Sequence, residues 1–250
     1  MPDDHFSVEF RFYAELGDFL PLERRGRSFE HPVAPHQSAK HVIEALGVPH
    51  GEVGLLLING ETAGMDCRLA ANDRVAVLPV LRRLMKPEAA SVAGFAADVH
   101  LGRLARYLRF AGFDTRWQST WDDAELVAVA ASEKRVVLTR DRALLMHKAL
   151  QAGCYLRDKE PLAQLADVAW RYALDLCAGR PARCLECNGV LEEIRKPDVA
   201  SQLLPGTLAG FDAFWRCTGC RRVFWRGSHW KHLRASLEKA AHAAGDHGSC

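Results

Sequence analysis

The first third of the chain alternates between apolar and polar positions in a way that predicts a small mixed sheet. A short helix is expected at 38–47, because Ser38 is a good N-cap and Gly47 a good stop. The expected strands lie at 6–13, 55–60 and 74–80. A strand, a helix and further strands over residues 1–81 predict a β-grasp domain.

The pattern changes after the first domain, because strands and helices now alternate along the chain. The expected strands are Gly94–Asp98, Asp114–Trp117, Val136–Thr139 and Cys154–Arg157, and the expected helices are 101–111, 122–133, 141–151 and 160–177. This alternation predicts an α/β domain over residues 92–179, with a parallel sheet flanked by helices. A linker is expected at 82–91.

Residues 180–234 are rich in Pro and Gly and contain few apolar residues, so a hydrophobic core alone would not hold them. Cys184 and Cys187 form one C-x-x-C pair, and Cys217 and Cys220 form a second. Four thiolates complete a tetrahedral Zn²⁺ site, and closed sites of this kind are structural. We therefore predict a zinc ribbon, followed by a C-terminal tail at 235–250.

Charge is distributed unevenly along the chain, although the net charge is only +2. Residues 1–80 contain seven Lys and Arg against twelve Asp and Glu, whereas residues 180–234 contain ten against five. The two ends are therefore expected to have different partners, and the basic end suits a polyanion. The chain has no apolar run long enough to span a membrane and begins without a signal peptide, so a cytoplasmic location is predicted.

Aspartates stand where expected strands end or helices begin. Asp98 and Asp141 follow two of the strands, and Asp122 and Asp123 open a helix. The carboxyl ends of parallel strands meet at one edge of a sheet, and clustered carboxylates repel one another unless a divalent cation lies between them. These positions predict a Mg²⁺ or Mn²⁺ site suited to phosphodiester hydrolysis. Helix capping is the alternative for Asp122 and Asp141, whereas the helix after Asp98 has no evident need of a cap.

The helix expected at 101–111 has an apolar stripe on one side and an arginine at every third position away from it. These arginines are Arg103, Arg106 and Arg109. Arginines beside a metal site bind phosphate and stabilise its charge, and Arg103 lies nearest to the aspartates in sequence. The alternative is a solvated helix face, above all for Arg106 and Arg109.

Basic and aromatic residues alternate over 221–232, directly after the second cysteine pair. Bases stack on aromatic rings while Arg and Lys contact phosphates, so this segment suits single-stranded nucleic acid. The candidate basic contacts are Arg221, Arg222, Arg226 and Lys231. The alternative is that Phe224 and Trp225 pack the ribbon against the preceding domain.

Two resemblances to known families follow from the motifs. Residues 1–80 resemble the ubiquitin-like sulfur carriers, through their pattern and through the segments 58–61 and 72–79. Those carriers end in a free Gly-Gly, whereas this chain continues without one, so a sulfur-carrier role is not expected. The resemblance instead favours a module that docks a protein or contacts RNA, or a purely structural cap.

Residues 94–177 resemble the mutator-seven C-terminal RNase domain, a PIN-like nuclease family. The matching motifs are Asp98 followed by Leu-Gly-Arg-Leu-Ala-Arg at 101–106, Asp-Asp-Ala-Glu-Leu at 122–126, and Leu-Thr-Arg-Asp-Arg at 138–142. The zinc ribbon belongs to the same pattern, and many bacterial members carry a ubiquitin-like domain in front. The resemblance therefore covers nearly the whole chain.

The resemblance to the mutator-seven RNase domain implies metal-dependent cleavage of RNA. By position, Asp98, Asp123 and Asp141 would hold Mg²⁺ or Mn²⁺, with Asp122 close by and Arg103 on the phosphate. Further residues implied at the site are Arg106 and Arg140 toward RNA, Thr139 toward Asp141, and Asp158 as a fourth acid. The alternative function is a non-catalytic RNA-binding adaptor that uses the basic ribbon and the β-grasp domain.

Overall fold

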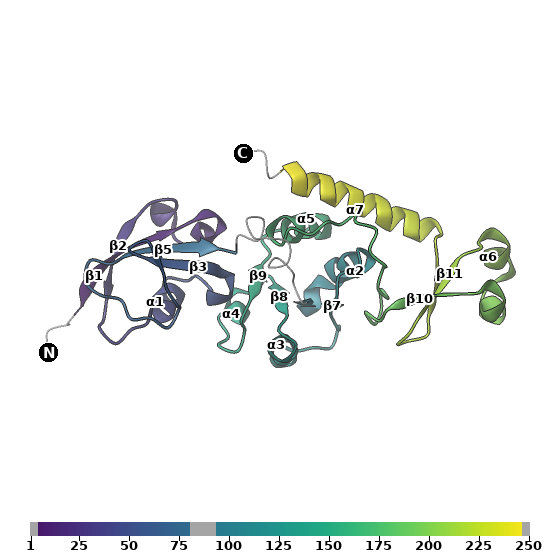
Figure 1. Ribbon diagram of the computed structural model, residues 1–250, viewed down its shortest axis with the longest axis horizontal. Helices are drawn as coiled ribbons and strands as arrows, with labels where there is room; N and C mark the ends of the chain where they lie inside the picture. The colour runs from purple at the N-terminus through teal and green to yellow at the C-terminus, as the bar shows by residue number, and fades with distance from the viewer. Residues whose placement is uncertain (1–4, 81–93, 247–250) are drawn as a thin grey trace. The chain divides into compact units, whose positions relative to one another are not determined.

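The computed structural model describes residues 5–80 and 94–246, which form two compact units (Figure 1). The first unit contains residues 5–80 together with 139–155, and the second contains 94–138 and 156–246. The linker expected at 82–91 lies outside the described residues. No helix in the described ranges has the length and apolarity that crossing a membrane requires.

The first unit contains a five-stranded sheet with the order β2-β1-β5-β3-β4. Its elements are β1 (Phe6–Phe12), η1 (Ala14–Phe19), η2 (Leu22–Arg24), β2 (Phe29–Val33), α1 (Ala39–Ala45), η3 (His50–Glu52), β3 (Val53–Ile58), β4 (Glu61–Thr62) and β5 (Arg74–Pro79). Strand β1 pairs in parallel with β5 and antiparallel with β2, and the apolar residues of α1 are buried in the core. The predicted β-grasp domain is confirmed.

Local signals in the sequence explain where these elements begin and end. The Ser38 side chain caps α1 by accepting a hydrogen bond from the His41 backbone at 3.3 Å. Asn59 and Gly60 have φ values of 53° and 92°, which suits the tight turn between β3 and β4. Strand β2 was not expected; Pro32 weakens its sequence signal but is tolerated because β2 is an edge strand.

The second sheet has the order β7-β6-β8-β9, and β6 pairs in parallel with both β7 and β8. Its elements are β6 (Phe95–Ala97), η5 (Val99–Leu101), α2 (Gly102–Phe110), β7 (Thr115–Arg116), α3 (Asp123–Ser132), β8 (Val136–Thr139), α4 (Arg142–Leu145), β9 (Gly153–Tyr155) and α5 (Pro161–Arg171). Every residue of β6 and β8 is buried, as in parallel sheets covered on both faces. Helix α3 contacts β6 and α2 contacts β7, so the predicted parallel sheet flanked by helices is confirmed.

Two helices are shorter than predicted. The helix expected at 141–151 ends at Leu145, where the Met146 and His147 backbones donate to the carbonyls of Ala143 and Leu144, three residues back, at 3.1 Å each. Farther along, the Leu150 carbonyl accepts a hydrogen bond from His50 at 2.8 Å. The helix expected at 160–177 ends at Arg171, because Ala173 has a positive φ of 51°.

The four cysteines lie in and beside a three-stranded antiparallel sheet, which is followed by a long helix. The elements are β10 (Leu191–Ile194), η6 (Lys196–Gln202), α6 (Pro205–Gly210), β11 (Phe214–Cys217), β12 (Val223–Trp225) and α7 (Ser228–Asp246). Figure 1 shows α7 running alongside α5, and the two helices are in contact. The tail expected from residue 235 therefore continues a helix. Its buried residues Leu233, Leu237, Ala240 and Ala244 have helical spacing, a signal that was present in the sequence.

Candidate functional site

The four cysteines of the two C-x-x-C pairs converge on one point. Their sulfur atoms all lie within 4.8 Å of one another, with Cys184 and Cys220 at 3.5 Å and Cys187 and Cys217 at 3.3 Å. A tetrahedral zinc ion with bonds of about 2.3 Å separates its sulfurs by about 3.8 Å, so the donor set and its spacing fit zinc. No position is left for water or substrate, which makes the site structural.

The turn after each cysteine pair has a residue in the left-handed region. Asn188 has φ 68° and Arg221 has φ 62°, each directly after the second cysteine of its pair. A Cβ on Gly189 would come within 2.8 Å of the Cys217 sulfur, so this position requires glycine. Gly219 has no such positive φ, and in the second turn Arg221 takes the left-handed conformation.

The cysteine thiols differ in how readily they ionise. Burial raises the pKa of the Cys184 thiol to about 12. Burial also opposes ionisation of Cys187, but hydrogen bonds from the Gly189 backbone and from neighbouring cysteines lower its pKa to about 6. Only thiolates bind metal, so a cation among the four sulfurs stabilises charge in a place where burial otherwise disfavours it.

Arg109 connects the first cysteine turn to the α/β domain through hydrogen bonds. Its side chain is 1% exposed and donates to the carbonyls of Leu185 and Glu186, at 2.9 and 3.0 Å. It also donates to the carbonyls of Thr115 and Trp117, at 2.9 and 3.2 Å. The alternative of a solvated helix face is therefore wrong for Arg109, because the cysteine turn covers that side of α2.

Asp114 makes a second connection between the same two parts. It accepts a hydrogen bond from Asn188 at 2.8 Å and pairs with Arg135 at 2.7 Å and Arg183 at 3.4 Å. Burial favours the protonated form of Asp114, but the hydrogen bonds from Arg135 and Asn188 outweigh it and hold the pKa of this carboxyl below its usual range. The ribbon and the α/β domain therefore share one buried polar network.

Replacing Arg109 with methionine is expected to lower the free energy of unfolding by about 3 kcal/mol or more, because four carbonyls lose their donor in a buried place. Arg106→Met is the matched control on the same helix. Arg106 pairs with Glu186 at 3.1 Å, but both side chains are more than 40% exposed, so the loss should stay below about 1 kcal/mol. Urea unfolding of the zinc-loaded protein measures both, and equal losses would contradict the anchoring role of Arg109.

Three of the candidate catalytic aspartates act as helix caps. The Asp98 carboxylate accepts from the His100 backbone at 3.1 Å, and the Asp141 carboxylate accepts from Ala143 at 2.7 Å. Asp122 forms a reciprocal capping box with Glu125. The expectation that Asp98 has no capping role is wrong, because the turn η5 precedes α2 and Asp98 caps that turn.

The candidate metal-binding aspartates differ in burial. Asp98 is buried, at 9% exposed, whereas Asp123 is exposed in the first turn of α3. Within residues 5–80 and 94–246, the four cysteines are the one place where three or more potential ligands gather, and the aspartates form no second group of this kind. Asp158 is exposed after β9, and its backbone carbonyl accepts from the buried Gln164 at 2.9 Å.

Asp141 lies in the segment Thr139–Tyr155, which belongs to the same compact unit as the β-grasp domain. The hydroxyl of Thr139 accepts from the Asp141 backbone at 3.0 Å, which supports a positioning role for this threonine. Farther along, Glu52 accepts from the Tyr155 backbone, and the Tyr155 ring lies 5.4 Å from that of Phe19. The β-grasp domain therefore packs directly against the segment that carries Asp141.

The predicted phosphate-binding arginines are accessible. Arg103 and Arg140 are exposed and make no ion pair within the described parts of the chain. Arg106 is exposed but paired with Glu186. Gly102 lies in the same motif as Arg103 and is required for packing, because a Cβ there would come within 2.6 Å of the Trp117 ring.

The four candidate RNA contacts of the ribbon, Arg221, Arg222, Arg226 and Lys231, are all exposed, and they differ in their neighbours. Arg222 lies 3.5 Å from Glu186. The Arg226 guanidinium lies over the rings of Trp215 and Trp230, at 5.0 and 5.3 Å from their centres. RNA binding by Arg221, Arg222, Arg226 and Lys231 stays a prediction.

Two family models match the two main parts of this chain. Residues 93–237 match the Mut7-C RNAse domain, and residues 6–85 match the Mut7-C ubiquitin domain. Two crystal structures of the small archaeal modifier protein 1 of Haloferax volcanii share 20% and 21% identity with this chain, at TM-scores of 0.25 and 0.24. They match 30% and 29% of this chain and 97% and 93% of their own length. No curated protein matches the chain. The match over residues 93–237, more than half of the sequence, shows that this chain belongs to the Mut7-C RNAse domain family, with a Mut7-C ubiquitin domain in front.

Proposed function

We propose that this protein is a metal-dependent ribonuclease that hydrolyses RNA phosphodiester bonds. One observation carries the proposal beyond family membership. Asp98 directly follows β6, and Asp141 comes two residues after β8, its parallel neighbour, with Ala97 opposite Leu138. Carboxylates at the carboxyl ends of adjacent parallel strands are in the usual position for an active site.

The residues of the proposed site have three roles: metal ligand, phosphate contact and support of a ligand. Asp98, Asp123 and Asp141 would hold Mg²⁺ or Mn²⁺, since both ions prefer carboxylate oxygens. When bound, such an ion supplies an activated water and offsets charge on the phosphate. Arg103 would contact the phosphate, and Thr139 would keep Asp141 in position through the hydrogen bond to its backbone.

Cleavage of RNA by the purified, zinc-loaded protein tests this function. A labelled single-stranded RNA should be cut when Mn²⁺ or Mg²⁺ is added and should stay intact when neither is present. Zinc content is measured in parallel, so that loss of the ribbon is not mistaken for loss of a catalytic ion. No cutting with either ion, or equal cutting without them, would overturn the proposal.

A non-catalytic RNA-binding adaptor is the second candidate, and one observation favours it. Asp98, Asp122 and Asp141 all have a structural use as caps, so their presence does not by itself require a catalytic ion. Under this alternative the ribbon binds RNA, the β-grasp domain docks a protein, and RNA stays intact with every divalent ion.

A further inference from the structure

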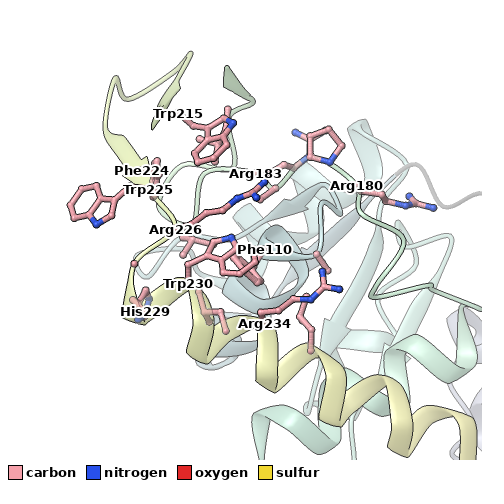
Figure 2. Close-up of a pocket in the computed structure, with 18 of the residues that line it drawn as sticks. Phe110, Arg180, Arg183, Trp215, Phe224, Trp225, Arg226, His229, Trp230 and Arg234 are labelled. Atoms are coloured by element: carbon pink, nitrogen blue, oxygen red, sulfur yellow. The ribbon is translucent and has the colours of Figure 1, made fainter. Parts of the chain in front are cut away.

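A groove with a volume of about 470 Å³ lies in the second unit, between the ribbon, the start of α7 and the end of α2 (Figure 2). Its walls come from segments far apart in the sequence, so no single motif reveals it. Five aromatic side chains line it: Phe110, Trp215, Phe224, Trp225 and Trp230. The groove is therefore a surface rich in flat rings, within the size range of ligand sites.

Two of the rings in the groove, those of Trp215 and Trp230, lie beside one arginine, Arg226. Trp230 packs edge-on against Phe110, with ring centres 6.0 Å apart, which holds the indole in place. Arg226 extends over both Trp215 and Trp230. Trp215 and Trp230 are only partly buried, so their rings remain accessible. The groove thus offers a guanidinium plane and indole faces side by side.

The charged side chains that line the groove are all positive. Four arginines line it, namely Arg180, Arg183, Arg226 and Arg234, and no Asp or Glu is among the lining residues. Arg183 and Arg234 have acidic partners outside the groove, Asp114 and Glu238. Arg226 is exposed and has no acidic partner among the residues that the structure describes. A ligand of this groove is expected to be anionic and to carry flat aromatic groups.

We propose that this groove binds single-stranded RNA, with unstacked bases on the indole rings and phosphates on the arginines. Single strands are bound through base stacking on aromatic rings and through a basic track for the backbone, and arginine adds cation–π contacts. A duplex keeps its bases stacked inside and would not use the rings. An acidic peptide would meet the arginines but would leave most of the rings unused. The proposal rests on the proposed function only for naming RNA as the nucleic acid.

Binding of a fluorescent oligouridine, followed by anisotropy without divalent ions, tests the groove in the full-length protein. Arg226→Ala is expected to weaken binding about tenfold, because it removes a phosphate contact and the guanidinium that lies over Trp215 and Trp230. Arg195→Ala is the matched control, since Arg195 is 83% exposed and lies outside the groove. It should change affinity less than about twofold. The same strand annealed to oligoadenosine should bind more weakly than the single strand.

Crosslinking supplies a second readout, and its main result comes from the wild-type protein. Oligouridine carrying 4-thiouridine should crosslink within residues 215–230 on irradiation, and Trp225→Ala should reduce the yield. If Arg226→Ala binds oligouridine as tightly as the wild type and the crosslinks lie outside residues 215–230, RNA binding by the groove is refuted. This holds even if the protein cleaves RNA with Mn²⁺. Tight binding through the groove without any cleavage would overturn the proposed ribonuclease activity and would support RNA binding by the groove. Binding of an acidic peptide but not of oligouridine would also refute it.

Discussion

Asparagine in place of Asp98 or Asp141 is expected to lower the rate of RNA cleavage at least about 100-fold, which corresponds to about 2.7 kcal/mol of transition-state stabilisation. The substitution separates two roles of each carboxylate. Asparagine accepts the same backbone hydrogen bond and is as good an N-cap as aspartate, so the caps to His100 and Ala143 are retained. What is lost is the negative charge that a divalent cation needs.

The control for these variants is Asp212→Asn, which removes the same charge from a side chain that is 97% exposed on the ribbon. It should leave the rate unchanged. The melting temperatures of all three variants should stay close to that of the wild type. Wild-type cleavage by both Asp98→Asn and Asp141→Asn would mean that these residues are caps and nothing more.

Serine in place of Cys217 is expected to abolish stoichiometric zinc binding and to unfold the ribbon. Cys217 is fully buried, and its sulfur also accepts a hydrogen bond from the Gly219 backbone at 3.3 Å. Structural zinc contributes about 10–16 kcal/mol of apparent binding free energy in zinc-finger peptides, as much as the whole stability of a typical domain. Zinc content by mass spectrometry and limited proteolysis between residues 184 and 226 measure the two effects.

The damage in Cys217→Ser should extend beyond the ribbon. Arg109 uses the carbonyls of Leu185 and Glu186 as acceptors, so a disordered cysteine turn would leave this buried guanidinium without two of its partners. Burial lowers the pKa of Arg109, so its buried charge is costly when it lacks hydrogen-bond acceptors. Cys177→Ser is the control, because Cys177 is a lone, partly exposed thiol. Retention of one zinc per chain in Cys217→Ser would contradict the assignment of the site.

The convergence of the four cysteines could be predicted from the sequence because the information that specifies each pair is local. Each C-x-x-C pair fixes two ligands within one turn, and zinc chemistry then requires the two pairs to meet. The same holds for the Ser38 cap and for the Asn59-Gly60 turn, which depend on neighbouring residues only. Such local features form in the same way whatever the surrounding tertiary structure.

The role of Arg109 could not be predicted, because helical periodicity describes one helix at a time. The carbonyls that Arg109 binds in the ribbon are 76 and 77 residues away along the chain. The hydrogen bond between the His50 side chain and the Leu150 carbonyl likewise joins residues 100 positions apart. The groove around Trp230 likewise needs three distant segments. Only the fold brings such partners together.

The position of Mn²⁺ in soaked crystals shows whether Asp98 and Asp141 are metal ligands. Anomalous data from both sides of the Mn absorption edge separate this ion from zinc in the ribbon. We predict a Mn²⁺ peak at about 2.1 Å from carboxylate oxygens of Asp98 and Asp141. A protein that cleaves RNA with Mn²⁺ while these two carboxylates bind no ion would contradict this prediction.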